Sequence, residues 1–557
     1  MKLAVKFALL PLLLFLAIFS RFYALMISPP SPYWEEVALG YDAYNITLTG
    51  RDHHGNFLPL SSFESFGDHK PSLYFYAAVP FIKIFGLNLL AVRLPTILAS
   101  LALILGTAVL SRFLFLHFYR PKDKQAANFV FHSSLFLGTI SPWLLVFSRS
   151  AWESVLASAL ILWGFIFGLF FIKSNRSKWL ILATLLLTLS TYAYHSARLT
   201  APLLGLSVMA AYFVYHRLTV KKISHQFNWR ALLLAAILGL IMIYPVTISL
   251  LGQSGQQRIA ETSIFNDLNL IEESNEWRAA YKNTWLARAF FHRYVFFARE
   301  AILNFASHFS YNYLFVSGDN NPRHSIQTFG NFYYLDLLLF IFAGYFLLRQ
   351  RRKISLLLFA FLLLGILPAA FTKATPHALR TLTAWPVFIV LLSFAWWQLV
   401  ELCKLKMTPK ILNTVLTLAY LVFFATFFYQ LIFIYPKKYR HEWQFGYEEM
   451  VGKLLDREAN YEQIYITREQ GRPAMYYFYY AQVEPRLVQT ANETARKDQG
   501  EFLNFGKISF IDQADELDLS KSILLISSPE FRAANFNQQA LKLIDQTEGE
   551  VWSFYEN

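Results

Sequence analysis

Residues 88–117 read NLLAVRLPTILASLALILGTAVLSRFLFLH, and no charged side chain lies between Arg93 and Arg112. A helix rises about 1.5 Å per residue, so roughly 20 apolar residues cross the ~30 Å hydrocarbon core of a bilayer. Apolar runs of this kind recur along the chain and predict about eleven membrane-spanning helices. The expected spans are 5–27, 88–117, 127–147, 151–173, 178–194, 197–216, 230–251, 332–348, 354–372, 377–400 and 411–435.

The composition also favours a polytopic α-helical membrane protein. A soluble domain carries roughly 25% charged residues, whereas this chain of 557 residues carries 16% and is 55% hydrophobic. Such a chain has too little polar surface to cover a water-soluble globule, so the bilayer is its expected solvent. The single cysteine, Cys403, excludes an intrachain disulfide and a cysteine-based metal cluster.

Basic residues predict the orientation of the spans. If the N-terminus lies inside, alternate connections are rich in Lys and Arg and follow the positive-inside rule. These residues are Arg112, Arg120, Lys122 and Lys124; Lys173, Arg176 and Lys178; Arg217, Lys221, Lys222 and Arg230; Arg349, Arg351, Arg352 and Lys353; and Lys404, Lys406 and Lys410. The net charge of +13 therefore reflects membrane orientation. Nucleic acid is not an expected partner, because no basic face lies on a soluble domain.

Three long segments are then expected on the outer side of the membrane: 28–87, 252–331 and the tail after 436. The chain is accordingly predicted to be a multi-pass protein of the plasma (inner) membrane whose functional surface faces the extracytoplasmic side. Membrane lipids are its expected surroundings.

The tail differs in composition from the rest of the chain. It mixes charged residues with short β-type runs such as QIYIT at 463–467, KISFI at 507–511 and SILLIS at 522–527. Helical stretches lie between these runs, a pattern typical of a small α/β domain. The predicted organisation is a membrane domain over 1–436 and an extracytoplasmic α/β domain over 437–557.

Acidic and basic side chains gather in the first outer loop. Glu35 and Glu36 follow the first span, and Asp68 and Lys70 come later in the same loop. A carboxylate near the bilayer can act as a general base, and a lysine can hold a phosphate. The alternative is a solvated loop with interfacial charges, and spacing alone does not separate the two interpretations.

Ionisable residues also flank the other outer connections, where they are costly unless paired or functional. Arg149 and Glu153 either pair at i,i+4 or belong to a site. For Arg198 and Arg380 an anionic ligand is the expected partner, because no acid is close in sequence. Further candidates are Arg323 and His324 in GDNNPRHSIQTFG, with Asp319 in the same loop, and His377 in TPHALRTL.

The histidines are scattered and show no paired-ligand spacing. A metal site is therefore only weakly indicated and no cofactor is predicted; a divalent metal is possible but has no support in the sequence.

Four short motifs stand in and just after the first outer loop. Residues 34–43 fit W-E-E-x-A-x-x-x-x-A, residues 49–59 fit T-G-R-D-x-x-G-x-x-x-P, residues 68–74 fit D-x-K-P-x-L-Y, and residues 92–95 are V-R-L-P. Together they resemble the start of GT-C glycosyltransferases, in the branch of the protein O-mannosyltransferases and aminoarabinose transferases. SPWLLVFSR, YAYHSAR, FVSGDNNPRHS and HALRTLTAWP continue the resemblance, which covers roughly residues 1–435. The tail resembles the small extracytoplasmic domain of many bacterial members.

This resemblance implies a GT-C membrane fold and a glycosyltransferase. The donor would be a hexose or pentose on a polyprenyl phosphate, the acceptor a hydroxyl of a lipid, glycan or protein, and the anomeric centre would invert. The family's first-loop acidic pair corresponds to Glu35 and Glu36, with Glu35 at the usual Asp position and therefore the expected base. Lys70 and Arg380 correspond to residues that contact the donor phosphate, and we add Arg198 as a third candidate.

Other functions are compatible with many spans. A transporter or flippase for a lipid-linked saccharide would be expected to carry broken helices and charges near mid-membrane, whereas the charges here gather at the outer edges. An O-antigen ligase or polymerase shares the spans and the large outer loop, but is not expected to open with an acidic first loop. A family member that only binds its ligand is a third alternative.

The orientation yields a direct test. Cysteines introduced at Asn56 and Asn492 should react with a membrane-impermeant thiol reagent in intact cells, because both positions are predicted to lie outside. Labelling only after the membrane is opened would reverse the orientation, and with it the face that carries the site.

Overall fold

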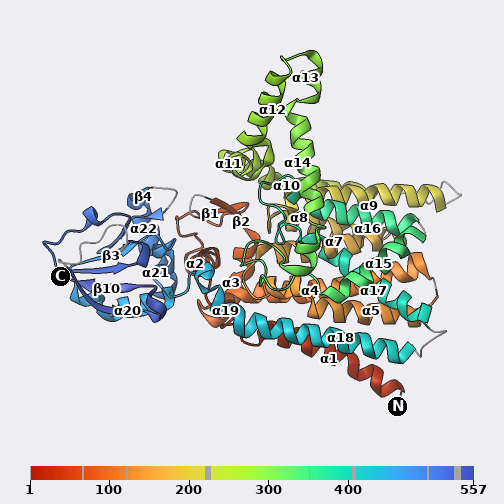
Figure 1. The fold of residues 1–557 in the computed structure, drawn as a ribbon, viewed down its shortest axis with the longest axis horizontal. Helices are drawn as coiled ribbons and strands as arrows, with labels where there is room; N and C mark the ends of the chain where they lie inside the picture. The colour runs from red at the N-terminus through yellow and green to blue at the C-terminus, as the bar shows by residue number, and fades with distance from the viewer. Residues whose placement is uncertain are drawn as a thin grey trace. The chain divides into compact units, whose positions relative to one another are not determined.

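The computed structural model describes most of the chain (Figure 1). The described residues are 2–65, 68–120, 122–219, 228–349, 352–403, 409–497, 501–531 and 541–557. Contacts between Cα atoms divide the chain into two compact units. The first comprises Met1–Tyr23 and Thr96–Leu431, and the second comprises Ala24–Pro95 and Ile432–Asn557.

The first unit is a bundle of apolar helices, and each segment predicted to span the membrane contains one of them. They are α1 (Lys2–Phe22), α4 (Leu89–Leu114), which enters this unit at Thr96, α5 (Lys124–Ile140), α7 (Glu153–Ser174), α8 (Ser177–Thr191), α9 (Ala197–Thr219), α10 (Trp229–Leu251), α15 (Tyr334–Arg349), α16 (Arg352–Ala370), α17 (Trp385–Leu402) and α18 (Pro409–Tyr429). The polytopic helical class is thereby confirmed.

Length and composition separate these helices into two groups. Among the described residues, six helices are long and apolar enough to cross a membrane: Leu89–Tyr119, Glu153–Ser174, Ala197–Tyr215, Trp229–Leu251, Leu382–Leu402 and Pro409–Lys438. Shorter apolar helices, such as Ser177–Thr191 and Leu356–Ala370, lie at other predicted positions. The total of about eleven spans stays a prediction.

Two predicted spans have different limits in the structure. The segment 127–147 is two helices, because α5 ends at Ile140 and α6 (Pro142–Phe147) begins at its proline. A proline ring disfavours helical backbone at the preceding residue, and Ser141 accordingly has a ψ of 123°. In the segment 377–400, the first residues form a turn, and α17 begins only at Trp385.

Two buried arginines donate hydrogen bonds to carbonyl groups at the ends of α1 and α5. The guanidinium of Arg149 donates to the carbonyl oxygens of Ser20 (2.9 Å) and Tyr23 (2.8 Å). Arg21 donates to the carbonyl oxygen of Thr139 on α5 (3.0 Å). The last carbonyl groups of a helix have no partner within the helix, and an arginine offers five donors in a fixed fork. Arg149 thus satisfies helix-end carbonyls that the helix itself leaves open.

The predicted outer segment 252–331 is largely helical. It contains α11 (Gln253–Thr262), α12 (Leu268–Ala280), α13 (Trp285–Phe290) and α14 (Arg293–Ser307). In Figure 1 these four helices extend away from the bundle and run across the direction of its long helices.

The C-terminal part of the second unit contains a mixed sheet, which confirms the predicted α/β region. Its strands are β3 (Gln463–Thr467), β6 (Asn504–Phe505), β7 (Ile508–Ile511), β8 (Ile523–Ser527), β9 (Lys542–Gln546) and β10 (Ser553–Glu556). Their order is β6-β7-β3-β8-β10-β9, with β3 parallel to both β7 and β8. Helices α20 (Tyr447–Arg457), α21 (Pro473–Tyr480) and α22 (Pro485–Ala495) accompany the sheet (Figure 1).

Residues 24–95 fold with this region rather than as an independent loop. They form α2 (Trp34–Thr49), the hairpin of β1 (Ser62–Ser65) and β2 (Asp68–Pro71), and the apolar helix α3 (Leu73–Phe85), which the sequence analysis did not predict. The hydroxyl of Tyr41 on α2 donates to the carbonyl oxygen of Val483 at 2.9 Å. The domain boundary at 436/437 stays a prediction.

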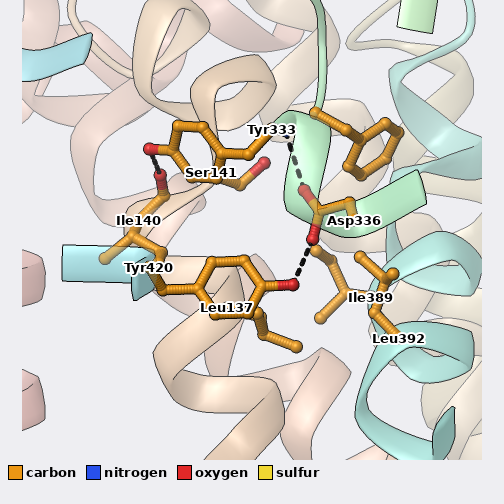
Figure 2. A pocket seen from close by; sticks show the side chains of 9 residues that line it. Leu137, Ile140, Ser141, Tyr333, Asp336, Ile389, Leu392 and Tyr420 are labelled. Carbon is orange, nitrogen blue, oxygen red and sulfur yellow. Dashed lines mark hydrogen bonds between the residues drawn. The ribbon is translucent and has the colours of Figure 1, made fainter. Parts of the chain in front are cut away.

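Within the first unit, one buried carboxylate joins α15 to α18 (Figure 2). Asp336 lies in the first turn of α15 and accepts the backbone N–H of Tyr333 (2.8 Å) and the hydroxyl of Tyr420 on α18 (2.6 Å). The Tyr333 hydroxyl donates to the carbonyl oxygen of Ile140 at 2.6 Å. The adjoining cavity of about 10 Å³ is at the lower limit for a single water, so protein groups satisfy the carboxylate.

Tyr420→Phe should therefore destabilise the bundle. Leaving a buried acceptor without its partner costs about 1–3 kcal/mol, which thermal unfolding of the purified protein in detergent would show as a lower Tm. Tyr244→Phe is the matched control, since Tyr244 lies on α10 and is 65% exposed. Equal Tm values for the two variants would contradict a stabilising role for the Asp336 contact.

Candidate active site

The two adjacent glutamates of the first loop have different surroundings. Glu36 is 3% exposed, and its two carboxylate oxygens accept Nε (2.8 Å) and Nη2 (2.9 Å) of Arg93. The Glu35 side chain is 33% exposed and forms an ion pair with Lys70. Neighbours on a helix point about 100° apart, so one turn of α2 presents one glutamate to the interior and the other to a half-open surface.

Arg93 is the residue that sequence reasoning missed at this site. It lies at the start of α4, is fully buried, and also donates to the carbonyl oxygen of Leu25 at 2.7 Å. The sequence did contain an indication that Arg93 has a partner, because a charged residue inside an apolar run is costly unless it is paired. Arg93 belongs to the V-R-L-P motif and binds the second glutamate of the W-E-E motif.

The hairpin positions Lys70. Phe63 on β1 is the Cα partner of Lys70 on β2, and the buried Phe63 ring stacks on Phe75 of α3 with a centroid distance of 4.1 Å. This packing fixes the hairpin against α3. The backbone of Asp68 begins β2, but its side chain lies outside the described residues.

The T-G-R-D-x-x-G motif forms a turn held by one aspartate. Asp52 accepts the backbone N–H groups of His54 (3.0 Å) and Asn56 (2.8 Å). Gly50 and Gly55 adopt φ values of +69° and +85°, which side chains with a Cβ rarely adopt. The four motifs of the first loop therefore all contribute to one folded region of the second unit.

A second ionisable pair, also missed from the sequence, lies beside this turn. His53 Nδ1 is 2.7 Å from Asp42 Oδ1, and both side chains are buried. Burial alone would lower the pKa of His53, but the Asp42 carboxylate outweighs it and raises that pKa above its usual value. The pair ties the turn to α2.

In the first unit, three predicted site residues come together. Asp319 Oδ2 lies 3.1 Å from His324 Nδ1 and 3.8 Å from His377 Nδ1. His308, which was not predicted, accepts the backbone N–H of His377 through Nε2 at 3.0 Å. The structure thus joins the GDNNPRHS and TPHALR segments, which are far apart in sequence.

The ionisation of this cluster follows from its burial. Burial alone would raise the pKa of Asp319, yet the hydrogen bond with His324 and the nearby imidazoles hold it at about 2. Burial lowers the pKa of His377 well below its usual value, and the neighbouring His324 and Arg380 act in the same direction. Burial likewise lowers the pKa of His308 to about 4. At neutral pH the cluster contains an ionised carboxylate, and His308 and His377 are uncharged.

Arg380 follows this cluster by one turn. Its Nη1 donates to the hydroxyl of Thr372 at 2.7 Å, and its side chain is half-buried. Trp143 binds the same turn, because its indole N–H donates to the carbonyl oxygen of Ala378 at 3.1 Å.

The remaining predicted residues have local partners. Arg149 binds the end of α1, as described above. Glu153 begins α7 and is buried, where a negative charge is favourable to the helix dipole. Arg198 donates from Nε to the carbonyl oxygen of Thr191 (3.3 Å), and Arg323 donates from its backbone N–H to Asn321 Oδ1 (3.0 Å).

No protein-family model matches the chain, and no curated protein matches it by sequence. Among solved structures, it is similar over almost its full length to ArnT from Cupriavidus metallidurans in the apo state. That likeness has a TM-score of 0.50 and 14% identity, and it covers 99% of this chain and 98% of ArnT. This chain has the GT-C fold.

Two further GT-C structures are similar at lower scores. ArnT from the same organism bound to undecaprenyl phosphate gives a TM-score of 0.49 with 14% identity, covering 98% of this chain and 97% of that one. The oligosaccharyltransferase AglB from Archaeoglobus fulgidus, in complex with an inhibitory peptide and a dolichol-phosphate, gives 0.41 with 11% identity, covering 86% and 64%. The full-length likeness to the apo ArnT structure confirms the GT-C fold expected from the first-loop motifs, while the roles of individual residues stay predictions.

Because the two glutamates have different surroundings, replacing each one should lower the Tm by a different amount. Removing one partner of a buried ion pair costs about 3–5 kcal/mol, so Glu36→Gln should lower the Tm strongly by leaving Arg93 without its carboxylate. Glu35→Gln is the matched control and should cost less than about 1 kcal/mol, because partly exposed pairs contribute little. Equal losses in the two variants would show that the Arg93 pair does not stabilise the fold.

Proposed function

We propose that this protein is a membrane glycosyltransferase that moves a sugar from a polyprenyl-phosphate carrier to an acceptor hydroxyl on the extracytoplasmic face. The observation that supports this function most directly is the Glu35–Lys70 ion pair on a half-open surface of a chain with the GT-C fold. A carboxylate and a cation side by side supply the two groups that the reaction needs.

The transfer is a single displacement at the anomeric carbon. The acceptor oxygen forms a bond to C1 while the bond from C1 to the phosphate oxygen breaks, which inverts the configuration. Glu35 accepts the proton of the acceptor hydroxyl as general base. The polyprenyl phosphate leaves with the bonding electrons, and cations stabilise its developing charge.

Lys70 has two roles in this mechanism. Before the donor binds, its ammonium group pairs with the Glu35 carboxylate. A phosphate is a competing anion, so donor binding draws Lys70 toward the phosphate and leaves the carboxylate able to accept a proton. Donor binding thus frees the Glu35 carboxylate to act as the base.

The choice of Glu35 over Glu36 follows from their partners. Both oxygens of Glu36 are engaged by Arg93 in a buried pair, and taking up a proton there would break that pair. The Glu35 side chain is one-third exposed, and its partner is a single lysine ammonium group rather than a two-bond guanidinium. On the sequence resemblance alone, Arg380 and Arg198 are proposed as further cations for the donor phosphate.

The mechanism predicts different defects for the base and the cations. Glu35→Gln should lower transfer by about 10²–10⁴-fold while undecaprenyl phosphate, used as the donor probe, still binds. Lys70→Ala and Arg380→Ala should weaken that binding by about 1.5–3 kcal/mol, or roughly ten- to a hundredfold. Binding is measured on purified protein, and transfer by intact-lipid mass spectrometry of cells, in which an inactive variant accumulates a polyprenyl-phosphate sugar.

Lys83→Ala, at an exposed position on α3, is the control and should change neither quantity. Full turnover in Glu35→Gln would overturn the proposed base, and unchanged probe affinity in both cation variants would overturn the phosphate site. A flippase would instead give the same lipid profile for Glu35→Gln and the wild type, together with lipid transbilayer movement in vesicles.

A further inference from the structure

Three metal-ligand side chains converge in the first unit. Asp319 and His324 come from the segment before α15, and His377 comes from the turn between α16 and α17. One ligand atom of each lies within 4.8 Å of the others. Asp319 and His324 are 4% and 7% exposed, so the three groups meet in a shielded position.

The distances suit a small metal ion. Zinc lies about 2.0–2.2 Å from nitrogen and oxygen ligands, which places tetrahedral ligand atoms about 3.3 Å apart. The Asp319 oxygen is 3.1 Å from one imidazole nitrogen and 3.8 Å from the other. All three ligand atoms lie within 4.8 Å of one another, so His324 and His377 would have to move closer together to share one ion.

The ligands are also held from outside. The Asp319 carboxylate accepts the backbone N–H groups of Ala378 (2.7 Å, at Oδ2) and Asn321 (2.9 Å, at Oδ1). The rings of Phe147 and Trp152 pack against His324, with centroid distances of 5.7 and 5.4 Å. Metal sites depend on such outer partners to orient their ligands and exclude water.

We propose that Asp319, His324 and His377 bind a divalent transition-metal ion, of which zinc fits best. Two imidazoles and one carboxylate are ligands that zinc prefers, whereas magnesium and calcium require mostly oxygen ligands. Three protein ligands leave a fourth position for a water or for an oxygen of an anionic ligand. This site goes beyond the proposed function and does not rest on it.

The ion would strengthen the junction of these two segments, which the hydrogen bond from the Ala378 N–H to Asp319 already joins. It would also fix the turn that carries Arg380, whose backbone N–H now makes a long contact of 3.4 Å with His377 Nδ1. Metal bound at this nitrogen would replace that contact. The site would therefore order the outer connections of the bundle.

The test is the metal content of the full chain, purified in detergent through a tag without histidine. A chelator first removes bound metal from the protein, which is then incubated with zinc chloride and separated from excess zinc. Elemental mass spectrometry measures the zinc that remains bound per chain. We expect about one zinc per chain for the wild type, and at least a hundredfold weaker zinc binding for Asp319→Asn and His324→Gln. His441→Gln, at a side chain that is 71% exposed, should bind zinc like the wild type.

Two further measurements make the result independent of folding defects in the variants. Zinc should raise the Tm of the wild type but not that of Asp319→Asn. X-ray absorption of the wild-type zinc should show imidazole nitrogens and no sulfur. Absence of zinc in folded wild type, sulfur from Cys403 in the absorption spectrum, or unchanged zinc content in Asp319→Asn, His324→Gln and His377→Gln alike would each overturn the proposal.

Discussion

The buried ion pair between Glu36 and Arg93 is the constraint on which the first-loop region depends. Removing two charges from water is costly, and the cost is offset only when the geometry is good and the remaining donors are satisfied. Arg93 meets this condition with two bonds to the carboxylate and one to the Leu25 carbonyl. Because α2 cannot rotate without breaking the pair, the neighbouring Glu35 is held on the open side of the helix.

This arrangement explains how one dipeptide serves two purposes. An acid that anchors a helix must keep its charge and its partners, whereas a base must exchange its proton during each reaction cycle. Adjacent positions on α2 allow both roles, since the helix turns their side chains in different directions. Lys70, carried by the hairpin, then needs to contact only the outer glutamate.

The sequence predicted those features that depend on local pattern. Long apolar runs located the helices, β-type runs at 463–467 and 522–527 located the central strands, and the first-loop motifs pointed to the GT-C fold. The sequence patterns did not predict which ionisable residues from separate segments would pair. Asp42 with His53 and Asp319 with His377 are pairs whose separation in sequence matches no known ligand motif. Helix α3 was not predicted because its 13 residues, which include Lys83, are too few to resemble a span.

The contact of Arg149 with the end of α1 also bears on how the protein is assembled. Ser20 and Arg149 are separated by 129 positions in the chain, and synthesis proceeds at roughly 5–20 residues per second. The first helix is therefore made on the order of ten seconds before Arg149, whose side chain binds its last carbonyl groups, has been synthesised. During that interval its carbonyl groups need other partners, so the first helix reaches its final contacts only after the two predicted spans 88–117 and 127–147 have been made.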